Sequence, residues 1–203
     1  MGALEKRLAF FAEFGTTVSD NGIAHIAWED YTAAQVEDIF RKAAAGERLS
    51  REAINRYKSA FLIEMAKLYK KYNFVMQLHI GTYLDANHRK VREIGQSTGF
   101  DCVDDSTAVK SVGQILDRLT ELDHLPKTIL YPLNPAQMEP FAVLAAGFCD
   151  GMVRGKVQLG APWWFNDQLG ELVERGEYFS DEKYLKDIIE GICYRNVKEY
   201  FGW

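Results

Sequence analysis

Phe74-Val75-Met76-Gln77-Leu78-His79-Ile80 is the stretch that decides the fold class. It is nearly continuous in apolar residues and is bounded by Asn73 and Gly81. Such a short apolar run between turn-forming residues is typical of a parallel strand that is covered on both faces. The stretch therefore predicts a central strand of a parallel sheet.

Three other runs resemble this one and extend the sheet. Residues 127–131 and 156–160 are apolar in the same way, and Thr16-Thr17-Val18-Ser19 is a shorter β-prone run that ends on Asp20. The sequence thus predicts four parallel strands near residues 15–20, 74–79, 127–131 and 156–160.

Helical patterns lie around and between these strands. Apolar spacing and capping residues predict helices over 4–14, from Thr32, from Ser50, and over 107–122, 135–148, 169–175 and 181–200. Within the helix that starts at Ser50, apolar residues three and four apart predict one buried stripe, formed by Ile54, Tyr57, Phe61, Met65, Leu68 and Tyr72.

Strands that alternate with helices indicate right-handed βαβ units and an α/β fold. A closed (β/α)8 barrel has eight strands and typically needs roughly 250 residues. Four strands in 203 residues therefore predict a single partial TIM-type barrel domain over 1–203, with βα units over 15–168 and C-terminal helices over 169–203.

Composition narrows the class of protein. The net charge of −5 excludes the broadly basic surface of non-specific nucleic-acid binders. No run approaches the roughly 18 apolar residues of a membrane span. We therefore expect a cytoplasmic protein without nucleic-acid or membrane partners. The three cysteines form no C-x-x-C pair, so buried free thiols are expected.

Polar residues at the carboxyl ends of the strands are candidates for the site, because ligands of α/β sheets and barrels bind there. His79 can ligate a metal or move a proton, or it can be a histidine satisfied within a polar network. Asp20 can be a catalytic carboxylate, or a turn former ahead of Asn21-Gly22.

Two further groups of residues are weaker candidates. Trp163 and Trp164 can pack against a sugar ring or cap the core, and adjacent residues do not face the same way, so at most one lines a pocket. Arg89, with Lys90 and Arg92, can bind a carboxylate or form a solvated helix face.

Several blocks resemble the uronate (glucuronate) isomerase family of the amidohydrolase superfamily. They are residues 76–81 (MQLHIG), 125–135, 155–160 with 163–167 (WWFND), 192–196 and 200–202. The resemblance runs from Phe10 onward. It implies a metal-assisted barrel, with zinc or manganese, that interconverts D-glucuronate and D-fructuronate, or D-galacturonate and D-tagaturonate. By motif, His79 matches an active-site histidine and metal ligand, and one of Trp163 and Trp164 matches a pocket residue.

The sequence also departs from the family pattern. The first-strand His-x-His block and the eighth-strand Thr-Asp-Ser-Arg block are absent, and Gln168 runs directly into Leu169. Asn21 stands where the family usually has histidine, and Leu84 where it usually has arginine.

Two hypotheses follow from these departures. In the first, the chain is a uronate isomerase that is impaired or inactive alone, and whose missing strands come from another chain or from the rest of a longer gene product. In the second, it is a noncatalytic half-barrel that self-associates or binds a partner. A homo-oligomer is expected because the terminal strands of a half-barrel are unpaired.

Overall fold

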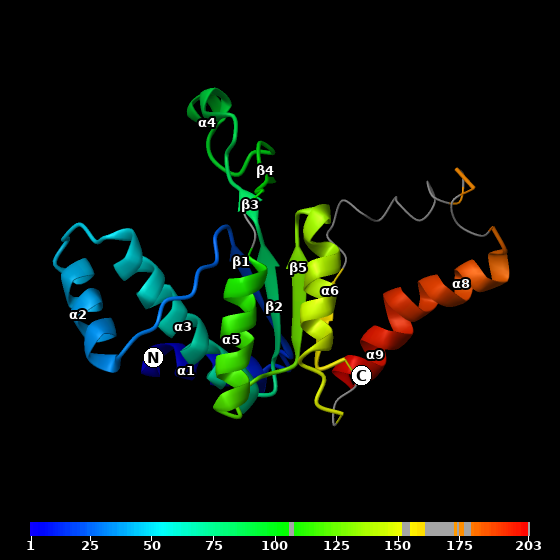
Figure 1. Cartoon of the computed structure of the whole chain (residues 1–203), viewed down its shortest axis with the longest axis horizontal. Coiled ribbons are helices and arrows are strands. Elements are labelled where there is room, and N and C mark those ends of the chain that lie inside the picture. Colours follow the sequence, from blue (N-terminus) through cyan, green and yellow to red (C-terminus); the bar gives the residue numbers. More distant parts are fainter. Residues whose placement is uncertain (106–107, 152–154, 161–172, 174, 177–179, 203) are drawn as a thin grey trace.

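Four parallel strands form the central sheet of the computed structural model (Figure 1), which describes residues 1–105, 108–151, 155–160, 173, 175–176 and 180–202. The strands are β1 (Val18–Ile23), β2 (Val75–Ile80), β5 (Thr128–Pro132) and β6 (Val157–Leu159). Their order is β1-β2-β5-β6, and each neighbouring pair is parallel. The prediction of four parallel strands is confirmed.

The first strand differs from its prediction in position. β1 begins at Val18 and continues through Asp20 and Asn21 to Ile23, so the interpretation of Asp20 as a turn former is wrong. Asn21 holds the strand in place because its Nδ2 donates to the backbone oxygen of Gln77 at 3.0 Å and its Oδ1 accepts from the Tyr69 hydroxyl at 3.0 Å.

Helices cover one face of the sheet and enclose the main core. They are α1 (Gly2–Glu13), α3 (Arg51–Lys71), α5 (Val109–Glu121) and α6 (Met138–Ala146), the last preceded by the 3₁₀ turn η1 (Pro135–Gln137). A further helix, α2 (Ala33–Ala44), packs on α3 away from the sheet (Figure 1). Fully buried members of this core include Ile63, Met76, Leu78, Leu116, Leu130 and Phe141. The predicted helices up to residue 148 are confirmed within a few residues at their ends.

The buried face of α3 agrees with the predicted stripe only in part. Met65 is buried, and Leu68 and Tyr72 pack against the core. Ile54 and Phe61 are exposed, and Phe61 belongs to a ring stack with Tyr57 and Phe40 of α2. The buried residues of the helix that the stripe did not include are Ser59, Ala60, Leu62, Ile63, Ala66 and Tyr69.

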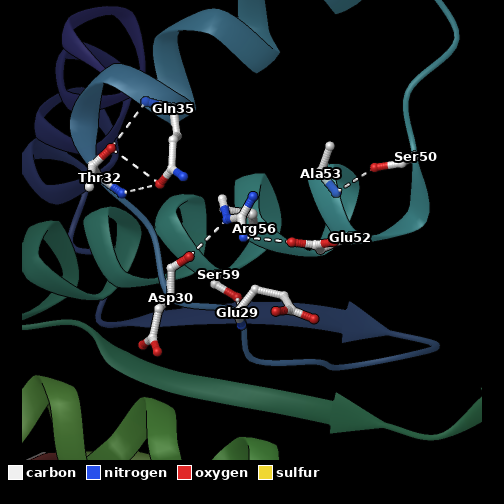
Figure 2. Close-up of polar contacts among 9 residues, drawn as sticks. All are labelled: Glu29, Asp30, Thr32, Gln35, Ser50, Glu52, Ala53, Arg56 and Ser59. Atoms are coloured by element: carbon white, nitrogen blue, oxygen red, sulfur yellow. Dashed lines mark hydrogen bonds and ion pairs between the residues drawn. The ribbon is translucent and has the colours of Figure 1, made fainter.

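The loop that leaves β1 is fixed to α3 by polar contacts (Figure 2). Ser59 Oγ accepts from the Glu29 backbone N–H at 3.0 Å, and Arg56 Nε donates to the backbone oxygen of Asp30 at 2.8 Å. Arg56 also pairs with Glu52 at 2.7 Å. Because Ser59 is buried, its bonds tie the loop to the core side of the helix.

Capping residues start α2 and α3 (Figure 2). Thr32 and Gln35 form a capping box at α2, and Ser50 Oγ accepts from the Ala53 backbone N–H at 3.1 Å at α3. Both starts agree with the sequence prediction.

The C-terminal segment is helical and reaches the other face of the sheet. It contains α8 (Glu182–Glu190), the π-helical turn η3 (Gly191–Arg195) and α9 (Asn196–Phe201), which confirms the predicted helix over 181–200. Tyr200 is buried against Val75 and Ile129. Lys127 Nζ donates to the backbone oxygen of Tyr200 at 2.6 Å. The predicted helix over 169–175 lies almost wholly outside the described residues.

A projecting segment that the sequence did not predict follows β2. It contains the antiparallel pair β3 (Thr82–Tyr83) and β4 (Cys102–Val103) and the short helix α4 (His88–Ile94), and it stands beyond the end of the sheet (Figure 1). Cys102 on β4 is exposed because this small pair has no core of its own, and Cys149 after α6 is exposed too. The expectation of buried thiols is wrong for both. No helix in the described part of the chain is long and apolar enough to cross a membrane.

Candidate active site

Asp20 and His79 meet on the sheet face opposite the main core. Residues alternate between the two faces of a strand, so Met76, Leu78 and Ile80 enter the core while Gln77 and His79 point the other way. The β1–β2 register pairs Asp20 with Gln77 and Gly22 with His79. Asp20 is therefore the diagonal neighbour of His79, and the distance from His79 Nδ1 to Asp20 Oδ1 is 2.7 Å.

The contact determines which atom of His79 remains for chemistry. An ionised carboxylate only accepts hydrogen bonds, so the proton of a neutral ring is assigned to Nδ1, which donates to Asp20. Nε2 is then an acceptor, and no other described residue hydrogen-bonds the ring. The His79 side chain is 23% exposed and that of Asp20 is 65% exposed, so the pair remains accessible from this face.

Tyr131 of β5 lies against the other side of His79. The two residues are paired in the β2–β5 register, and their rings stack with centroids 4.4 Å apart and an interplanar angle of 13°. Burial raises the pKa of Tyr131, and the negative charge of Asp20 raises it further. The phenol therefore stays neutral at physiological pH and presents an uncharged face to the imidazole.

Gly160 gives the Tyr131 ring its space. A Cβ atom at residue 160 would lie 1.9 Å from Cε1 of Tyr131 and 2.4 Å from two other ring atoms. No side chain larger than hydrogen fits there unless the tyrosine moves. Sequence reasoning missed both residues, although the signal existed: Tyr131 lies in a predicted strand and shares the face of His79 once the register is known.

The other predicted site residues are not joined to this pair. Arg89 lies on α4 in the projecting segment, its side chain is 82% exposed, and its Nε is 3.1 Å from Glu93 Oε1. Trp163 and Trp164 lie outside the described residues. The structure thus brings Asp20 and His79 together and shows Arg89 in a local helix ion pair.

The side chains around His79 supply too few donors for a metal ion. Among the described residues, no group of three His, Cys, Asp or Glu side chains could hold one. A catalytic zinc site typically has three protein ligands, so Asp20 and His79 do not form such a site by themselves.

The fold and this pair define an α/β protein whose candidate site lies toward the carboxyl ends of parallel strands, as in TIM-type barrels. The glucuronate isomerase family model matches residues 1–169. The chain belongs to the glucuronate isomerase family.

Individual relatives agree with this assignment. The chain is 34% identical to the uronate isomerase of Lachnospira eligens over 247 aligned residues, which covers 99% of this chain and 53% of the relative. It is also 34% identical to the uronate isomerase of Clostridium perfringens, in a match that covers 98% of this chain and 53% of the relative. The chain thus spans about half the length of the curated relatives it matches. Since 247 aligned positions exceed the 203 residues of the chain, the relative has residues inside the matched region that this chain lacks.

Solved structures share the fold. The uronate isomerase of Thermotoga maritima superposes with a TM-score of 0.69 at 30% identity, covering 82% of this chain and 35% of that one. The glucuronate isomerase of Caulobacter crescentus gives a TM-score of 0.77 at 20% identity, covering 99% of this chain and 50% of that one, a likeness that shows the fold alone. Both support a partial barrel.

Proposed function

We propose that this chain carries the Asp20–His79 part of a uronate isomerase active site. The observation that carries the proposal is the 2.7 Å contact between these side chains, at the strand edge where barrel enzymes place their chemistry, in a chain of the glucuronate isomerase family. The reaction interconverts D-glucuronate and D-fructuronate, or D-galacturonate and D-tagaturonate.

In this reaction a proton leaves C2 of the aldose while the carbonyl oxygen O1 gains one, which gives an enediol. A proton is then delivered to C1 while O2 loses its own proton, so that the ketose has the same composition as the aldose. The acceptor Nε2 of His79 suits the role of general base, because histidine exchanges protons near neutral pH. When Nε2 takes the proton, the ring becomes an imidazolium and the Asp20 carboxylate stabilises its charge. Asp20 also holds the Nδ1–H tautomer that leaves Nε2 free to act.

The proposed substrate also has a carboxylate, which needs a cation. Arg89 is the candidate from the sequence, and it is accessible because its side chain is 82% exposed. Binding substrate would require Arg89 to exchange its contact with Glu93 for one with the sugar. Exposed i,i+4 pairs contribute only about 0.3–0.5 kcal/mol, so this exchange costs little. Trp163 or Trp164 is proposed to line the sugar pocket.

A divalent metal, zinc or manganese, is proposed as the family's cofactor. His79 would contribute one ligand through Nε2, and because a metal-bound Nε2 cannot take a proton, metal ligand and general base are alternative roles of His79. No three described His, Cys, Asp or Glu side chains form a group that could hold the ion, so at least one further ligand must come from outside the described residues. The 203-residue chain alone is therefore expected to have no appreciable isomerase activity.

Self-association is proposed from the open sheet edges. Within the described sheet, β1 pairs only with β2 and β6 pairs only with β5. Unpaired strand edges favour association. Light scattering should show a mass above 23.1 kDa that rises with concentration, and a constant monomer mass would contradict this expectation.

Reconstitution tests the function. The chain is mixed with a fragment of the Lachnospira eligens relative that contains the part this chain does not match, and assayed on D-glucuronate and D-galacturonate with zinc, manganese or no added metal. Turnover is expected only in the mixture, and His79→Ala should abolish it. His124→Ala is the matched control, because His124 is exposed and far from the pair in the sequence.

Two outcomes would overturn the proposal. Turnover in the mixture that survives His79→Ala would remove His79 from the mechanism. No turnover in any mixture would favour the noncatalytic half-barrel.

A further inference from the structure

We propose that Tyr131 is a positioning residue for His79, and that Gly160 is the residue that allows it to be one. The proposal deepens the proposed function and rests on it for its catalytic meaning. Its geometric content concerns only the described residues of the sheet face.

Two contacts restrain the imidazole in different ways. The hydrogen bond from Nδ1 to Asp20 Oδ1, at 2.7 Å, selects the edge of the ring that faces the carboxylate. The parallel stack on Tyr131, with centroids 4.4 Å apart and 13° between planes, fixes the plane of the ring. Either contact alone leaves one rotation free, whereas together they orient Nε2. A catalytic group must be held close to its productive geometry by supporting residues.

The two glycines that flank His79 and Tyr131 on the sheet differ in the space around them, and this difference supports the role of Gly160. Gly22 is paired with His79 on the β1 side, and Gly160 follows β6 beside Tyr131, its N–H donating to Leu130 O at 2.9 Å. A Cβ at Gly22 would meet nothing within 4 Å, whereas a Cβ at Gly160 would overlap the Tyr131 ring at 1.9 Å. Neither glycine has a positive φ, so the backbone of both accepts alanine. Gly160 is thus required by the tyrosine ring and not by the backbone.

The experiment uses the 203-residue chain labelled with ¹⁵N and ¹³C in histidine, and reads the ring signals of His79 by NMR. His79→Ala assigns the signals. In the unchanged protein, we expect Nδ1 to be protonated and the carbon-bound ring protons to be shifted upfield by the stacked tyrosine. Gly160→Ala and Tyr131→Leu should move these protons downfield and should mix the two tautomers.

Two variants are matched controls. Gly22→Ala adds the same methyl group on the other side of His79 and should leave the signals unchanged. Tyr131→Phe keeps the ring, loses only the hydroxyl, and should also preserve both the shift and the tautomer. A purely structural contribution of residue 131 would change stability without moving the tautomer equilibrium.

The result can overturn the inference without reference to turnover. Unchanged His79 signals in Tyr131→Leu, which adds no steric overlap, would refute it even if Gly160→Ala failed to fold. A Tyr131→Phe spectrum like that of Tyr131→Leu would also refute it, because the hydroxyl would then be responsible. If His79→Ala leaves the reconstituted isomerase active, the proposed function fails while the positioning result still stands.

Discussion

Asn21 joins β1 to α3 through a hydrogen bond whose contribution can be measured. Its Oδ1 accepts from the Tyr69 hydroxyl at 3.0 Å, and Tyr69 is only 5% exposed. Asn21→Ala removes this acceptor, leaves Ser19 as the remaining hydrogen-bond partner of the hydroxyl, and also removes the bond from Asn21 Nδ2 to the backbone oxygen of Gln77. A hydrogen bond contributes about 0.5–1.5 kcal/mol, so the loss of two should lower the free energy of unfolding by about 1–3 kcal/mol.

Tyr69→Phe removes the other side of the same bond. Asn21 is half-buried, so water can satisfy its oxygen, and the expected loss is only about 0.5–1.5 kcal/mol. In the double variant the hydrogen bond that both side chains share is lost once, whereas the two single losses count it twice. The decrease in the free energy of unfolding of the double variant should therefore be smaller than the sum of the two single decreases by about 1 kcal/mol. This difference lies within the range of interaction energies measured for residues in contact.

Urea unfolding, monitored by circular dichroism, gives the free energy of unfolding of the unchanged protein, the two single variants and the double variant. The comparison requires similar urea dependence of the unfolding free energy in each variant, because a changed slope indicates an altered denatured state. Losses that add to within about 0.5 kcal/mol would show that the two side chains are not coupled, and the reasoning from the 3.0 Å contact would be refuted.

Two further predictions concern stability. Met76 is fully buried between the sheet and its helices, so Met76→Ala should lower the free energy of unfolding in urea by about 2–5 kcal/mol. The control is Phe14→Ala, at a residue 76% exposed, which should change that free energy by less than about 0.5 kcal/mol. Equal effects of the two variants would contradict the assigned core. Burial raises the pKa of Tyr69 and Tyr200, so above pH about 10 the unfolded chain releases phenolic protons that the folded chain keeps, and stability should fall as pH rises. Tyr200→Phe should lessen that fall above about pH 10, and an identical pH profile in both proteins would count against the buried position of Tyr200.

The strands were predictable because burial on both faces leaves a strong mark in the sequence. Residues 74–80 read as a strand from apolar continuity alone, and β2 follows at Val75–Ile80. β1 was harder because Asp20, Asn21 and Gly22 are turn formers by local preference. Pairing with β2 and the hydrogen bonds of Asn21 override that preference, and neither is visible in a local window.

The candidate site was predictable in part for a related reason. Strand alternation put His79 on the same side as Gln77, and the position of Asp20 at a predicted strand end marked it as a separate candidate, but the contact between the two needed the β1–β2 register. Tyr131 needed the register between β2 and β5, which depends on how distant segments pair. Gly160 needed the position of the Tyr131 ring itself. Both missed residues thus depend on contacts between distant segments, and these contacts cannot be read from the local sequence of either one.

The sequence departs from the family pattern at Asn21 and at Leu84, and the positions of these residues in the fold show that the two departures have different consequences. Asp20 and His79 share the accessible face, whereas Asn21, one residue on, turns toward Tyr69 on the helix side. A histidine at residue 21 would project to the helix side too, so its absence removes no ligand from the face that carries His79. Leu84 lies in the projecting segment and is exposed, so an arginine there would require no change in the core. The departure at Asn21 therefore concerns the attachment of α3 to β1, and the departure at Leu84 concerns the exposed surface of the projecting segment.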